Sequence, residues 1–113
     1  MRKIEQQMIS AIKSETNWKS GNTSVHYSEE YGTSTVYLHD NLIAIVSDND
    51  MEIFDGGYQS NTTKSRLNAL INEFCNAITD GVFQKNYQWF ISDNNEVKPF
   101  TSGYIFAWFY DVF

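Results

Sequence analysis

Residues 33–57 read TSTVYLHDNLIAIVSDNDMEIFDGG, and this stretch decides the fold class. Its apolar runs are rich in β-branched and aromatic residues, and short turns with Asp and Asn separate them. This pattern is typical of antiparallel strands in a hairpin meander. Turns are expected at residues 40–41 and 48–50, and Asp55-Gly56-Gly57 ends the last strand. With an earlier strand that turns at residues 29–32, the predicted strands cover residues 24–28, 33–39, 42–46 and 51–54.

Two predicted helices flank the meander. In each of them apolar residues recur every three or four positions, which is the period of an amphipathic helix. The first helix is expected from about Lys3 to Ser14. The second can be capped within residues 61–63, and Gly81 lies just past its end. Its apolar face consists of Leu67, Leu70, Ile71, Phe74 and Ile78.

Two more strands are expected after the second helix, over residues 82–91 and 104–113, with Pro99 marking the entry to the last one. The sequence therefore predicts a single α+β domain over residues 1–113. A four-strand meander and two C-terminal strands form an antiparallel sheet that two helices pack against, in the order α-β-β-β-β-α-β-β. Because the last strand is apolar on both faces, either helices or a second subunit must cover it, so a homodimer is an open alternative.

Composition limits the classes of function. The single cysteine, Cys75, excludes an intrachain disulfide and a cysteine-based zinc site, and its apolar helical surroundings favour a buried residue over a reactive thiol. The polar N-terminus does not resemble a signal peptide. No apolar run approaches the ~20 residues of a spanning helix. We therefore expect a soluble protein of a reducing cytoplasm, with no membrane partner.

The charge is unevenly distributed. The chain has a net charge of −6, and residues 21–60 contain seven acidic residues but no Lys or Arg. Two interpretations are open: a solvated rim of the sheet, or an anionic surface for a basic partner such as the nucleic-acid groove of another protein. The candidate partner-binding residues are Glu29, Glu30, Asp48, Asp50, Glu52 and Asp55.

Basic and aromatic residues give a second candidate surface. The stretch from Gly56 to Arg66 opens the second helix with two glycines, several hydroxyls and two bases, and it can bind an anion through backbone N–H groups. The alternative is a turn and a helix cap with both bases solvated. Lys64, Arg66 and Lys85 are the candidate anion- or nucleic-acid-binding residues. On the strand from residue 82, the side chains of Lys85, Tyr87 and Trp89 share a face, as they would in a base-stacking platform. Because the protein is acidic, we favour core aromatics over such a platform.

No catalytic or metal-binding set is evident in the sequence. An EF-hand loop that starts at Asp48 fails, because Ile53 stands where glycine is needed and Gln59 where glutamate is needed. His26 and His39 are expected on neighbouring strands, but no Ser or Cys is specified beside either of them. We therefore expect no enzyme, no metal and no cofactor.

Several strings resemble a family of short, functionally uncharacterised bacteriophage proteins. They are residues 21–25 (GNTSV), 36–39 (VYLH), 41–44 (NLIA), 56–58 (GGY), 60–70 (SNTTKSRLNAL) and 82–90 (VFQKNYQWF). The resemblance covers roughly residues 4–91, and it brings no activity or catalytic residues. It implies a phage accessory protein that acts in the host cell cytoplasm by binding and blocking a host protein, including components of antiviral defence.

Together these observations favour a phage-encoded binding protein that inhibits or redirects a host macromolecule through its acidic surface, for instance an antiviral defence complex in the manner of an anti-CRISPR. Two alternatives stay open. One is a nucleic-acid-binding accessory protein that uses Lys64, Arg66 and Lys85, although the acidic charge makes direct nucleic-acid binding the weaker reading. The other is a binder of, or enzyme for, a small phosphorylated ligand at the Gly56–Arg66 turn.

Overall fold

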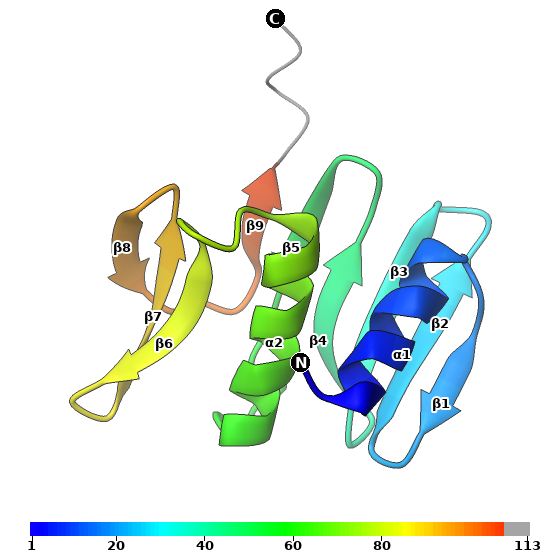
Figure 1. Cartoon of the computed structure of the whole chain (residues 1–113), viewed down its shortest axis with the longest axis horizontal. Helices are drawn as coiled ribbons and strands as arrows, with labels where there is room; N and C mark the ends of the chain where they lie inside the picture. The colour runs from blue at the N-terminus through cyan, green and yellow to red at the C-terminus, as the bar shows by residue number, and fades with distance from the viewer. Residues whose placement is uncertain (108–113) are drawn as a thin grey trace, which may run out of the picture.

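The computed structural model describes residues 1–107, and these residues form an α+β fold, as the sequence predicts (Figure 1). Two helices accompany nine strands in the described part of the chain. In chain order they are α1 (Lys3–Lys13), β1 (Trp18–Ser20), β2 (Thr23–Ser28), β3 (Thr33–Leu38), β4 (Asn41–Val46), β5 (Asp50–Ile53), α2 (Asn61–Phe74), β6 (Gly81–Lys85), β7 (Gln88–Asp93), β8 (Glu96–Pro99) and β9 (Tyr104–Ala107).

The strands form two antiparallel sheets. The larger sheet has six strands in the order β1-β2-β3-β4-β5-β9, so the predicted four-strand meander, β2 to β5, forms its centre. The smaller sheet is the meander β6-β7-β8. Both helices cover one face of the larger sheet, and α2 also contacts β6 (Figure 1). The helices therefore lie on one side of the meander, whose other face they leave uncovered.

The larger sheet contains a strand that the sequence did not predict. It lies between the predicted first helix and the predicted first strand, where β1 pairs with β2 and Trp18 lies opposite Val25. Trp18 packs against the core from this strand, while Lys19 is exposed. Because β1 has only three residues, it offers no alternation from which a strand could be predicted.

The predicted strand over residues 82–91 is a hairpin. It turns at Asn86 and Tyr87, whose φ angles of 53° and 66° are left-handed, the conformation of a two-residue hairpin turn. A second turn of this kind, at Asn94 and Asn95, leads into β8, a strand that was not predicted. Pro99 ends β8 instead of marking the entry to the last strand. Within the predicted last strand, β9 covers Tyr104–Ala107, and residues 108–113 lie outside the described residues.

Both ends of α2 differ from expectation. Ser60 caps its start, and the Ser60 hydroxyl accepts a hydrogen bond of 3.0 Å from the Thr63 N–H. The helix ends at Phe74, so Ile78, predicted to lie on its apolar face, is 91% exposed. Asn76 and Asp80 accept hydrogen bonds from backbone N–H groups of this segment, which favours a turn over a further helical turn.

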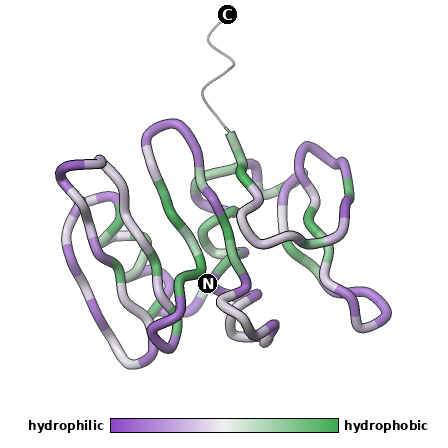
Figure 2. The backbone as a smooth tube through the Cα atoms, turned by 180° about the vertical axis from the view of Figure 1, so that it is seen from behind, coloured by the Kyte–Doolittle hydropathy of each residue, from purple (hydrophilic) through white to green (hydrophobic). Residues whose placement is uncertain are grey.

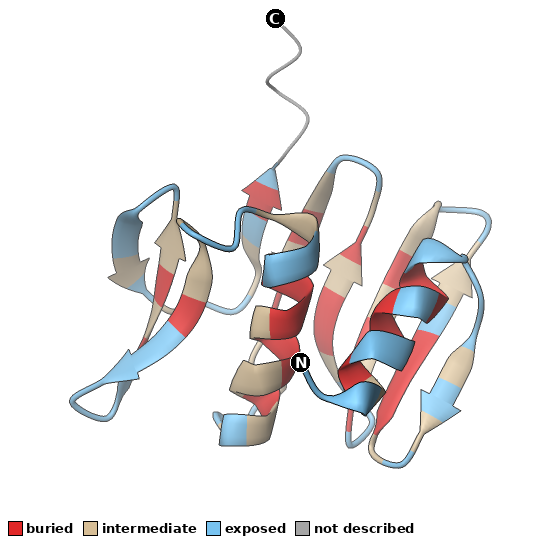
Figure 3. Ribbon diagram, viewed as in Figure 1, coloured by how far each residue is buried: buried red, intermediate tan, exposed pale blue. Residues whose placement is uncertain are grey.

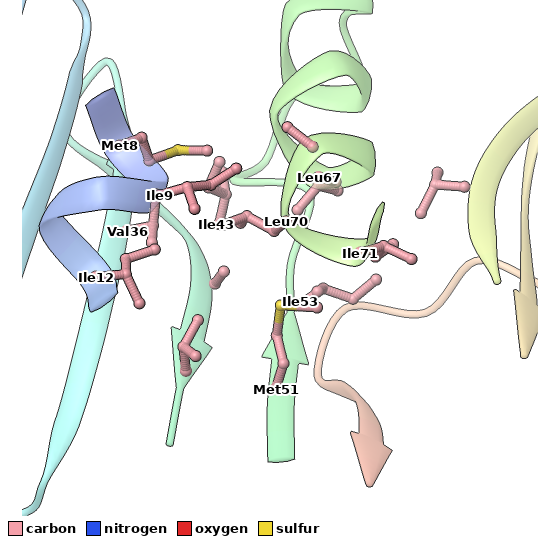
Figure 4. Close-up of a cluster of buried hydrophobic side chains, with 14 of the residues drawn as sticks. Met8, Ile9, Ile12, Val36, Ile43, Met51, Ile53, Leu67, Leu70 and Ile71 are labelled. Atoms are coloured by element: carbon pink, nitrogen blue, oxygen red, sulfur yellow. The ribbon is translucent and has the colours of Figure 1, made fainter. Parts of the chain in front are cut away.

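One hydrophobic core connects both sheets and both helices. Figure 4 shows the apolar faces of α1 and α2 meeting over the meander, and Figure 3 shows the buried residues on the facing sides of these elements. The central side chains are Met8, Ile9, Ile12, Val36, Ile43, Met51, Ile53, Leu67, Leu70 and Ile71. The core continues to the smaller sheet through Val82, Trp89 and Ile91.

A buried ion pair joins the two helices. Arg66 on α2 is 3% exposed, and its Nη1 donates to Glu5 Oε2 on α1 over 2.8 Å. The Ser65 hydroxyl donates to the same carboxylate over 2.6 Å, and Arg66 Nε donates to Thr23 Oγ1 on β2 over 3.0 Å. The interpretation of Arg66 as a solvated or nucleic-acid-binding base is therefore wrong, because this guanidinium is a buried structural group.

We expect the Glu5 carboxylate to make stability depend on pH. Burial alone would raise its pKa, but hydrogen bonds from Ser65, Arg66 and the Arg2 backbone, with the Arg66 charge, lower the pKa below the ordinary 4.5. A lowered pKa stabilises the fold above pH 4.5, and this stabilisation is lost as the pH falls through the lower, folded-state value. In urea titrations at several pH values, wild type should therefore be more stable than Glu5→Gln at pH 7, and the difference should shrink below about pH 4. A constant difference would contradict this assignment.

Candidate functional site

Two turns of the meander place acidic residues at one end of the larger sheet. Glu29 and Glu30 lie in the β2–β3 turn, and Asp48 lies in the β4–β5 turn; all three are exposed. Alternate turns of an antiparallel meander lie at the same end of the sheet, and Figure 1 shows both turns at the upper end of the view. Figure 2 shows the hydrophilic character of the β4–β5 turn.

The C-terminal ends of both helices complete this end of the molecule. A groove of about 380 Å³ lies between them and the two turns. The residue after the last turn of α1, Glu15, lines it together with Tyr27 and Asp48. Glu73 also lines it, but its carboxylate pairs with Lys13. We define the acidic edge as Glu15, Glu29, Glu30, Asp48 and Asp50.

Three carboxylates of the acidic edge act on the same group, the phenol of Tyr27. Desolvation raises the pKa of the Tyr27 phenol, and the negative charges of Glu15, Asp48 and Glu29 raise it further. The C-terminal ends of α1 and α2 add the negative ends of two helix dipoles. Acidic side chains and helix C-terminal ends are therefore brought together beside Tyr27.

The structure separates the six predicted acidic residues. Asp50 begins β5 near the acidic edge, and its Oδ1 accepts a hydrogen bond of 3.0 Å from Ser47 Oγ. Glu52 lies opposite Ile45 and Ile105, on the face of the sheet that the helices do not cover. Asp55 follows the other end of β5, where its carboxylate accepts the Gly57 N–H over 2.8 Å and shapes that turn. The predicted surface is thus reduced to four of its six acidic residues.

The predicted basic residues do not form one surface. Lys64 Nζ donates to Gln84 Oε1 over 3.3 Å and lies 5.8 Å from the centre of the Trp89 ring. Lys85 is exposed beside the tip of the β6–β7 hairpin, whereas Arg66 is buried. Gly56 has a left-handed φ of 72°, and a Cβ there would lie 3.3 Å from both Asn41 Cβ and Ile43 Cγ2. This glycine therefore serves a tight turn.

The two histidines and the predicted aromatic face do not form a site either. His26 on β2 lies opposite Thr35 and contacts the Tyr37 ring at 5.3 Å, while His39 lies in the β3–β4 turn. Trp89 is buried and Tyr87 is a turn residue, so the predicted face of Lys85, Tyr87 and Trp89 does not exist. Among residues 1–107, no three His, Cys, Asp or Glu residues gather in a way that could hold a metal ion.

Cys75 behaves as the sequence suggests. Burial, with the nearby charges of Asp80 and Asp93, raises the pKa of its thiol to about 12. The reactive thiolate is therefore scarce at neutral pH.

Sequence reasoning missed Glu15, Tyr27 and Glu73 at the groove. The charge count over residues 21–60 excluded both glutamates, and Tyr27 was taken only as a strand residue. Both glutamates lie at the C-terminal ends of helices. This position places them beside the acidic turns only once the packing of the helices on the sheet is known.

Neither helix of the described residues is long and apolar enough to cross a membrane. The model of a family described as Kyanoviridae Gp96 protein, a family of phage proteins, matches residues 1–107. This match confirms the resemblance found in the sequence. No curated protein and no solved structure matches the chain.

Proposed function

The chain belongs to the Kyanoviridae Gp96 protein family, a phage protein family, and from this premise we propose that it is a small binding protein that inhibits or redirects a host macromolecule through its acidic edge. Its site of action is the host cytoplasm. The partner is a host protein with a basic surface, and a nucleic-acid-binding component of an antiviral defence complex fits this chemistry. The protein acts by occupying that surface, without catalysis.

One observation carries this proposal: Glu15 and Asp48 line one groove, and Glu29 and Glu30 lie in the neighbouring turn, whose Gly32 also lines the groove. Among the described residues that line the groove, Lys13 is the single base, and it pairs with Glu73. A protein surface that binds phosphates carries clustered Lys and Arg, so it attracts a rigid array of carboxylates in the same way. Such complementarity increases the association rate and selects basic partners over acidic ones. The pairing would leave the partner unable to hold nucleic acid.

The proposal is tested in two steps. Affinity capture from infected host lysate with mass spectrometry identifies the partner, and the purified pair is then measured by biolayer interferometry. In the variant Glu29→Lys/Glu30→Lys we expect binding to weaken roughly 100-fold or more, mainly through a lower association rate, because like charges now meet. The loss should be smaller at high salt.

The matched control is Asp40→Lys/Glu96→Lys. It changes the net charge by the same amount, but Asp40 lies in the β3–β4 turn, at the opposite end of the larger sheet, and Glu96 lies on β8, so both are away from the acidic edge. Circular dichroism verifies that both variants fold. If the control weakens binding as much as the edge variant, or if the edge variant binds like wild type, the acidic edge is not the binding surface.

A further inference from the structure

The smaller sheet has an outer face that the predicted surfaces include only through Lys85. Its inner face carries the buried Val82, Trp89 and Ile91, which join the core. Side chains alternate along strands, so the neighbours of these residues point outward. We call this outward set the aromatic platform: Phe83, Lys85, Gln88, Phe90, Val97 and Pro99.

The centre of the aromatic platform is a pair of phenylalanines. Phe83 on β6 lies opposite Phe90 on β7, and their rings are 5.6 Å apart with an angle of 21° between their planes. Phe90 lies in turn opposite Pro99 on β8. Phe83 is 36% exposed, and Val97 in the next row is 55% exposed. A cross-strand aromatic pair stabilises a sheet, but an apolar row open to solvent is also typical of a binding surface.

The charges of the aromatic platform differ in sign from those of the acidic edge. Lys85 is its charged residue, whereas Lys64 lies on the inner face of the sheet, beside Gln84 and over the Trp89 ring. Asp93 on β7 and Glu96 on β8 lie opposite each other, on the inner face of the smaller sheet. Figure 1 shows the β6–β7 hairpin pointing away from the acidic turns of the larger sheet. Because the Debye length is about 8 Å at physiological salt, the acidic edge has little effect here.

We propose that the aromatic platform binds one or two unpaired bases of a single-stranded nucleic acid. The rings of Phe83 and Phe90 offer stacking surfaces, and every base has a complementary face, so the binding is tolerant of sequence. Lys85 contacts a flanking phosphate. With one or two bases and one lysine, the interaction is weak, and its dependence on salt is modest.

The size of the face argues against a second copy of the chain as its occupant. Strands of five, six and four residues make a face of roughly 17 by 14 Å. A stable dimer buries about 800 Å² on each partner, several times this area. A pair of stacked bases fits it. This inference does not depend on the proposed function, because the two surfaces share no residue.

The test measures fluorescence anisotropy of a short fluorescein-labelled oligo(dT) with the full chain at low salt. We expect saturable binding by wild type, and no binding of an abasic oligonucleotide of the same length, which has the phosphates without the bases. Phe83→Leu/Phe90→Leu keeps the face apolar but removes the aromatic rings, and it should weaken binding roughly 10-fold or more. Lys85→Glu should weaken binding and reduce its dependence on salt.

Tyr58→Ala is the control, because Tyr58 is 75% exposed but lies outside the aromatic platform. It should bind like wild type. Absence of oligo(dT) binding, equal binding of the abasic probe, or unchanged binding by the double leucine variant would each overturn the proposal. The last result would indicate that the oligonucleotide binds outside the aromatic platform. If the double leucine variant does not fold, the abasic probe and Lys85→Glu still decide.

Discussion

Replacement of Arg66 by methionine is expected to lower the free energy of unfolding by about 3–5 kcal/mol. The Glu5 carboxylate is 2% exposed, and Arg66 is its ion-pair partner, so the variant would leave a buried negative charge without a counterion. The change would also remove the hydrogen bond from Arg66 Nε to Thr23 Oγ1, which ties α2 to the start of β2. Urea denaturation followed by circular dichroism measures the loss.

Two further variants separate the buried charge from other effects. Glu5→Leu/Arg66→Met removes both charges, and it should recover much of the lost stability, since an apolar pair can replace a buried ion pair at little cost. Lys13→Met breaks the more exposed pair with Glu73, and it should cost less than about 1 kcal/mol. If the double variant is less stable than Arg66→Met, the penalty does not come from the unpaired Glu5.

This ion pair could have been predicted from the sequence. Arg66 precedes Leu70 by four positions and therefore shares the apolar face of α2, as Glu5 shares that of α1 with Met8 and Ile9. Opposite charges on the buried faces of two helices could have predicted their pairing. Our prediction instead assigned Arg66 to the hydroxyl-rich stretch before it.

Some turns could be predicted from the sequence and others could not. Asp40, Asp48 and Asp55 were predicted correctly as turn residues, because Asp, Asn and Gly favour turns, whereas Asp50 was expected in a turn but begins β5. Alternation of the turns could have placed Glu29, Glu30 and Asp48 together, and Asp55 at the opposite end. The turn at Tyr87 has no such signal, because a bulky aromatic residue rarely adopts a left-handed φ. The division of residues 82–91 into two strands therefore depends on tertiary structure.

Replacement of Asn68 by alanine is expected to lower the free energy of unfolding by about 2–3 kcal/mol. Asn68 on α2 binds the outer edge of β6 as a neighbouring strand would. Its Nδ2 donates to the Val82 carbonyl, and its Oδ1 accepts the Val82 N–H, both over 2.8 Å. Val82 is 3% exposed, so the variant leaves a backbone donor and a backbone acceptor unsatisfied. Urea denaturation measures the total loss, and hydrogen exchange at the Val82 amide locates it.

The control is Asn72→Ala, an exposed position of the same helix, where alanine favours the helix and stability should not fall. Asn68→Asp is more specific, because its carboxylate still accepts the Val82 N–H but puts an oxygen against the Val82 carbonyl where the donor was, so its loss should be at least as large as that of Asn68→Ala. A three-stranded sheet of short strands is marginal by itself. Faster exchange limited to β6, β7 and β8 would therefore mean that α2 holds the aromatic platform in place. Equal losses in Asn68→Ala and Asn72→Ala would show that the two hydrogen bonds do not anchor β6.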